Sequence, residues 1–171
     1  MFRNCRIVLL GVVIGLALMG TAHTQALEKA NSLLAFERLT SLVGAWQGVQ
    51  DGNEITLTYS LTADSSALME EFRVAKTVMV TMFTVDGDHL IATHYCSAGN
   101  QPQMVTARIT DPLASSLAFS LSRVTGMKAP GDWHNTGLTV TLEDKQHLTQ
   151  VWTYEYNGKK GTNTFHFTRR T

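Results

Sequence analysis

His94 and Cys96 are the side chains of this sequence whose types and spacing most directly suggest chemistry. Residues two apart on a β-strand point to the same face, so a strand through this segment places the imidazole beside the thiol. Such a pair can hold a transition metal or a haem iron, or can form an activated thiolate. The alternative is structural, with a hydrogen-bonded histidine inside a core and a cysteine that packs as a small hydrophobe.

Asn100 and Gln101 lie just beyond the same strand, in the turn Gly99-Asn100-Gln101-Pro102. Their amide groups supply both donors and acceptors, at a position that we expect to be the rim of a sheet. They either contact a ligand at this rim or hold the turn in place.

His134 and Gln150 are two further polar residues that the sequence pattern places among apolar ones. His134 shares the alternation of Val140, so we expect it to face inward, where it could join His94 in a two-histidine site. Gln150 shares the alternation of Trp152, and an inward amide must bind a partner, a water or a ligand.

The sequence lacks the motifs of common hydrolases, metalloproteases, phosphate-binding loops and dithiol redox centres, which favours a binding protein over an enzyme. Glu70 and Glu71 are adjacent, so on a strand they face opposite ways and cannot act as a pair. The chain has 14 basic and 14 acidic side chains with no charged run, which excludes nucleic acid as the expected partner.

The elements that position these residues are β-strands. Stretches at 55–61, 117–122, 138–142, 148–155 and 164–168 alternate apolar and polar residues, with many β-branched threonines. Turn signals separate them, as at Asp51-Gly52, Asp86-Gly87, Ala98-Gly99 and Asn157-Gly158. About ten short antiparallel strands follow from this spacing, preceded by an amphipathic helix over 27–42 with Leu33, Phe36 and Leu39 near one face.

Trp46 opens the first strand after Gly44, and Arg169 closes the last strand with the same alternation as Phe165 and Phe167. An inward guanidinium needs a partner, and the Trp46 ring can supply one by cation–π stacking. The two residues can meet only if the sheet closes on itself. We therefore predict a closed antiparallel up-and-down barrel of about ten strands with a short N-terminal helix.

The segment Gly44-Ala45-Trp46, together with the C-terminal Arg169, resembles the calycin superfamily of lipocalins, fatty-acid-binding proteins and nitrobindin-like haem barrels. This resemblance implies a barrel with a ligand site inside. The segments 42–46, 85–90 and 93–102 are also similar to a group of exported bacterial proteins of uncharacterised function. That similarity implies a fold and carries over no activity.

The N-terminus has the pattern of a signal peptide. Arg3 and Arg6 precede an apolar run over 7–19 that is too short to span a bilayer comfortably, and small residues follow it. We expect cleavage within 22–26, which divides the chain into a signal peptide at 1–26 and a lipocalin-like barrel domain at 27–171. The exported product is then periplasmic or secreted, without stable membrane insertion, and Cys96 is its lone cysteine because Cys5 leaves with the leader.

The expected function is the binding of a small apolar or amphipathic molecule inside the barrel. Two alternatives remain open: a haem- or metal-binding barrel that uses His94 or His134, and a filled barrel that acts through its surface. The predicted walls are Leu57, Tyr59, Met82, Phe119, Val140, Trp152 and Phe165. The predicted ligand contacts are His94, Cys96, Asn100, Gln101, His134, Gln150, Trp152 and Tyr59, with Gly44, Trp46 and Arg169 in structural roles.

Overall fold

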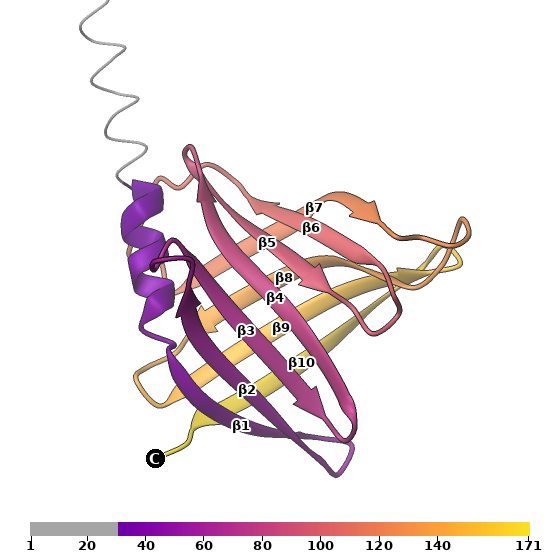
Figure 1. Ribbon diagram of the computed structural model, residues 1–171, viewed down its shortest axis with the longest axis horizontal. Helices are drawn as coiled ribbons and strands as arrows, with labels where there is room; N and C mark the ends of the chain where they lie inside the picture. Colours follow the sequence, from indigo (N-terminus) through magenta and orange to yellow (C-terminus); the bar gives the residue numbers. More distant parts are fainter. Residues whose placement is uncertain (1–30) are drawn as a thin grey trace, which may run out of the picture.

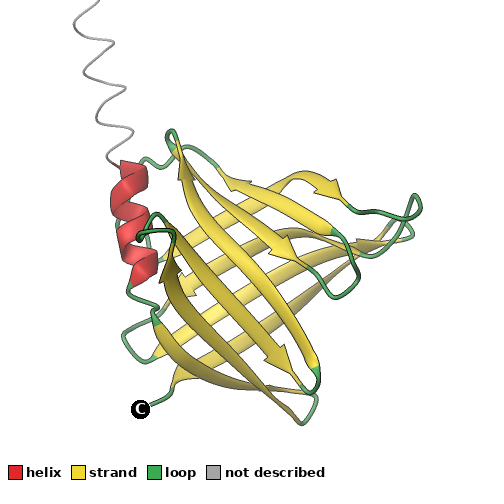
Figure 2. Cartoon of the chain, in the orientation of Figure 1, coloured by secondary structure: helices red, strands yellow, loops and turns green. Residues whose placement is uncertain are grey.

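The computed structural model describes residues 31–171, and its architecture confirms the predicted closed antiparallel barrel with one short helix. The expected signal peptide at 1–26, its cleavage region and the first residues of the expected helix, 27–30, lie outside the described residues. The described helix covers 31–40 (Figure 2). No helix within residues 31–171 has the length and apolar character needed to cross a bilayer.

Ten strands, each paired antiparallel with its neighbours in sequence, wrap round until the last pairs with the first (Figure 1). The pattern of alternating buried and exposed residues along most strands places one face inside and one in solvent. The strands are β1 (Gly44–Gln50), β2 (Asn53–Thr62), β3 (Ala67–Val74), β4 (Thr77–Asp86), β5 (His89–Tyr95), β6 (Gln101–Thr106), β7 (Ser116–Thr125), β8 (His134–Leu142), β9 (His147–Tyr156) and β10 (Lys159–Arg169).

Trp46 and Arg169 meet at the seam between β1 and β10, as the sequence predicts. They are direct partners in the register, and the guanidinium carbon lies 4.2 Å from the centre of the indole ring. The Arg169 guanidinium donates to the carbonyl oxygens of Ser41, Val43 and Lys145 at 2.8–2.9 Å. One side chain therefore joins the helix end, the first strand and the β8–β9 turn to the last strand.

Gly44 is required at this seam for two reasons. Its φ of +127° lies in a region that side chains rarely adopt. A Cβ atom at this position would also stand 3.1 Å from the Arg169 Nη1 atom. The absence of a side chain lets the guanidinium reach the backbone of the preceding turn.

The helix closes one end of the barrel (Figure 1). Ser32, Ala35, Phe36 and Leu39 form its buried face, and the Ser32 hydroxyl donates to the Gly87 carbonyl in the β4–β5 turn. The predicted buried face was wrong at one residue, because Leu33 is exposed. The buried residues are spaced three, four and seven positions after Ser32, as expected for one face of a helix. Below the helix the interior is filled by side chains that include Trp46, Leu57, Phe83, Phe119, Leu138 and Leu148.

Replacing Arg169 with alanine should lower the free energy of unfolding by about 2 kcal/mol, because it removes the cation–π contact and three charge-assisted hydrogen bonds. Arg169→Lys should recover only part of this loss, since an ammonium cannot present a planar fork to three carbonyls. Urea unfolding followed by circular dichroism measures the effect. Arg170→Ala, at the exposed neighbouring residue, is the matched control, and an equal loss in that variant would contradict the assignment.

Candidate functional site

The end of the barrel opposite the helix is hollow. It contains a cavity of about 180 Å³. Four aromatic rings dominate its walls, and among the described residues that line it no side chain is a lysine or an arginine. The lining residues are Gln50, Glu70, Phe72, Val74, Met79, His94, Trp133, Asn135, Trp152, Asn163 and Phe165.

His94 is the predicted site residue that the structure places most clearly in this cavity. It is 3% exposed, its ring centre lies 4.8 Å from that of Trp152, and its Nδ1 atom lies 2.9 Å from the Thr81 hydroxyl oxygen. Among the described residues its second nitrogen, Nε2, has no hydrogen-bond partner. His94 therefore offers one unpaired imidazole nitrogen at the wall of an otherwise mostly apolar cavity.

A buried polar network adjoins His94. Its central carboxyl belongs to Glu70, which also lines the cavity and which we did not expect in the site. Glu70 Oε2 accepts from the Tyr59 hydroxyl and from Gln150 Nε2, both at 2.5 Å. Gln150 Nε2 also donates to the Tyr59 oxygen at 2.7 Å, and Gln150 Oε1 accepts from Trp152 Nε1 at 2.9 Å. Glu70 Oε1 accepts from Thr81 at 3.3 Å, which connects the network to His94.

Burial dominates the electrostatics of these groups. Desolvation raises the pKa of Glu70 above its ordinary value, against the lowering effect of its three donors. Desolvation, reinforced by the neighbouring Glu70, also raises the pKa of Tyr59 well above 10, so its hydroxyl stays protonated. Burial lowers the pKa of His94 to about 4, so the imidazole is neutral near pH 7.

Tyr59 and Gln150 were predicted to contact a ligand, and the structure places both behind the cavity wall. Each is at most 1% exposed and each is bonded within the network. Trp152 and Phe165, two of the predicted walls, do line the cavity. Met82 differs from the prediction, because it alternates with the buried residues Thr81 and Phe83 and so faces outward.

Cys96, Asn100 and Gln101 gather at the β5–β6 turn and do not line the cavity. The Cys96 thiol is buried, and its sulfur accepts from the Ala98 N–H. Asn100 Nδ2 donates to the carbonyl of Trp133 at 2.7 Å, while its Oδ1 is buried without a partner among the described residues. Asn100 therefore connects the turn to Trp133, which lines the cavity.

His134 is not beside the cavity, which corrects its expected inward orientation. The pairing of β8 with β9 shifts register between Asn135 and Gly137, so the alternation that runs through Val140 reverses before it reaches His134. Asn135 takes the inward position and lines the cavity. His134 Nδ1 instead contacts the Asp132 carbonyl oxygen, and the two histidines do not converge.

Neither haem nor a metal ion fits the residues present. A cavity of about 150 Å³ holds benzene, and a porphyrin is several times larger than that, so a space of 180 Å³ does not enclose haem. Within residues 31–171 no three histidine, cysteine or acidic side chains gather in a way that could hold a metal ion.

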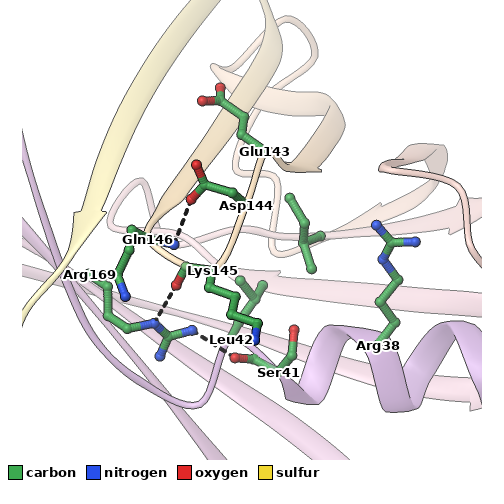
Figure 3. Close-up of a pocket in the computed structure, with 9 residues that line it drawn as sticks. Arg38, Ser41, Leu42, Glu143, Asp144, Lys145, Gln146 and Arg169 are labelled. Atoms are coloured by element: carbon green, nitrogen blue, oxygen red, sulfur yellow. Dashed lines mark hydrogen bonds between the residues drawn. The ribbon is translucent and has the colours of Figure 1, made fainter.

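A larger groove of about 640 Å³ lies outside the barrel, between the helix end and the β8–β9 turn (Figure 3). Three of its charged side chains already serve the fold. Arg169 donates to backbone carbonyls, Asp144 caps the turn at Gln146 and His147, and Arg38 donates to the Leu113 carbonyl. The aromatic cavity inside the barrel is therefore the stronger candidate site.

No protein-family model matches the chain, and no curated protein matches it either. Several solved structures are similar in fold, among them the following two. Rv2717c from M. tuberculosis aligns with a TM-score of 0.57 and 12% identity, over 80% of this chain and 98% of that one. A protein of unknown function from the DUF3598 family of Nostoc punctiforme PCC 73102 aligns with a TM-score of 0.50 and 15% identity, over 77% of this chain. This chain spans about half, 48%, of the Nostoc protein, and at such identities the likeness shows the fold alone.

The buried neutral His94 should make the protein sensitive to acid. The unfolded histidine takes up a proton near pH 6.5, whereas the folded one does so only near pH 4, so stability is present above 6.5 and falls as the pH drops toward 4. The loss should approach about 3 kcal/mol. Glu70 acts in the opposite direction, because its raised pKa gives stability that is present at low pH and lost as the pH rises.

Urea unfolding of His94→Gln at several pH values between 4 and 7 tests this assignment. The variant should lose the acid-dependent fall in stability, even if it is less stable at neutral pH. His166→Gln, which replaces an exposed histidine on β10, should keep the wild-type pH dependence. Identical pH profiles for wild type and His94→Gln would show that His94 is not a buried neutral histidine.

Proposed function

We propose that this protein reversibly binds one small apolar or amphipathic molecule in the cavity at the open end of the barrel. The observation that carries the proposal is the combination of aromatic walls with one unpaired imidazole nitrogen, His94 Nε2. Small-molecule sites typically have apolar walls and a few placed polar groups that fix orientation. Gln50, Asn135 and Asn163 add three amides to the same lining.

The size of the cavity sets the size of the molecule. An engineered cavity of about 150 Å³ in another protein stays dry and binds benzene. The 180 Å³ cavity of this barrel suits a single six-membered ring with one small substituent. The Phe72 and Phe165 rings, which meet edge to face with centres 5.5 Å apart, form one wall against which such a ring can pack.

The proposed binding protein is exported and carries no nucleic-acid or membrane partner. The support for export is the sequence pattern of 1–26 described above. Expression of the full chain in a Gram-negative host should give a periplasmic product whose N-terminus, measured by mass spectrometry, falls between 23 and 27. Recovery of the protein in the cytoplasm with an intact Met1 would contradict the proposal.

A pair of neighbouring substitutions on β10 tests the site. Asn163 lines the cavity, whereas Thr164 is exposed on the outer face. Asn163→Phe should occupy the cavity and weaken the binding of toluene at least about tenfold, since a filled space offers no surface to bury. Thr164→Phe adds a similar volume outside and should leave binding unchanged. Isothermal titration calorimetry measures both, and equal affinities in the two variants would place the binding site elsewhere.

A further inference from the structure

The hydrogen-bond network behind His94 has only one consistent orientation on its Gln150 side. The indole N–H of Trp152 can only donate, so the Gln150 atom that contacts it must be the amide oxygen. Gln150 Nε2 therefore faces the Tyr59 oxygen and Glu70 Oε2, and donates to both. Since the Tyr59 oxygen accepts from Gln150, its own hydrogen points to Glu70 Oε2.

These two donors decide where Glu70 can carry a proton. Oε2 accepts from both Tyr59 and Gln150 and has no room for a hydrogen of its own. A proton on the carboxyl must therefore sit on Oε1, the oxygen that faces Thr81. Ionisation of Glu70 therefore changes the hydrogen bond between Oε1 and the Thr81 hydroxyl.

Thr81 has one hydrogen and two neighbours that compete for it. When Glu70 is ionised, the hydroxyl donates to Oε1, because otherwise an anionic oxygen would face a lone pair at 3.3 Å. Thr81 then accepts from His94 Nδ1, and Nε2 is a bare acceptor. When Glu70 is protonated, it donates to Thr81, Thr81 donates to Nδ1, and the remaining imidazole hydrogen is on Nε2.

We propose that Glu70, acting through Thr81, sets whether His94 Nε2 accepts or donates in the cavity, and that the ionised form selects small aromatic molecules with a hydroxyl or N–H donor. Phenol represents this ligand class. The inference rests on the proposed function, because it names the ligand class of the same cavity. Thr81 is a positioning residue here, and His94 is the residue that hydrogen-bonds the ligand. Glu70 acts on the imidazole through Thr81, and its side chain also lines the cavity.

The groups around Glu70 leave its own titration as the event that operates this switch. The groups that face the Glu70 carboxyl are Tyr59 from β2, Thr81 from β4 with His94 of β5 behind it, and Gln150 from β9. Of these, Tyr59 stays protonated and His94 stays neutral above about pH 4. Burial raises the pKa of Glu70, so its titration is the event that changes the network as the pH rises.

Calorimetric titration with three ligands of similar size tests the inference. Phenol donates a hydrogen bond, benzonitrile only accepts one, and toluene does neither. Between about pH 5 and about pH 8 the ratio of phenol affinity to benzonitrile affinity should rise about tenfold. In the protonated state both ligands can accept from Nε2–H, whereas in the ionised state phenol can donate to Nε2 and the benzonitrile nitrogen is left unpaired. Toluene affinity should stay constant over the same range.

Two variants separate the relay, the hydrogen-bonded series Glu70–Thr81–His94, from general effects on folding. In Glu70→Gln the carbonyl must face Tyr59 and Gln150, so the amide nitrogen faces Thr81 and imitates the protonated carboxyl. That variant should show, at every pH, the low phenol-to-benzonitrile ratio that wild type shows at low pH. Thr81→Val breaks the connection, so it should bind all three ligands with a phenol-to-benzonitrile ratio that no longer changes with pH.

The outcomes distinguish this inference from the proposed function. If none of the three ligands binds the wild-type protein, the proposed function fails. If all bind but the wild-type ratio is flat with pH, or equals that of Glu70→Gln at pH 8, the cavity is a binding site and the relay is wrong. A preference for phenol that strengthens at low pH overturns the relay as well.

Discussion

The seam between β1 and β10 is the constraint on which the rest of the structure depends. Only two residue pairs of the described strands are aligned across this seam, and one of them is Trp46 with Arg169. An open sheet would leave two edges unpaired, whereas closure gives the barrel an inside. The network exists only because of this closure, since Tyr59 on β2 and Gln150 on β9 approach each other across the interior with β1 and β10 between them.

Closure also divides the interior into two unlike halves. Beside the helix, large side chains such as Phe83 and Phe119, whose ring centres lie 5.7 Å apart, leave a packed core. At the other end the inward positions carry amides, an imidazole and rings that stand around a cavity of about 180 Å³. The barrel is therefore neither the hollow cup nor the filled barrel that the sequence left open. Its packed half supplies the rigid base on which the cavity is held.

The strands could be predicted from sequence because two local signals agree. Alternation places one face in water, and the pairs Asp51-Gly52 and Asn157-Gly158 adopt the positive φ values that tight hairpins need. The site could be predicted only in part. His94 sits on a regular strand and points where its alternation predicts, whereas the register shift near Asn135 displaced His134. Glu70 was missed because its partners come from other strands, and no local pattern shows which strands face one another.

The Glu70 network is difficult to explain by stability alone. Burying a carboxyl without a cationic partner is costly, and its hydrogen bonds offset that cost only in part, as the raised pKa shows. A leucine at this position would be expected to give a simpler core, since replacing buried ionisable groups with apolar ones is often neutral or stabilising. The network instead leads through Thr81 to His94, a polar residue that lines the aromatic cavity and whose Nε2 has no partner among the described residues. Its geometry is better accounted for by control of that atom than by support of the barrel.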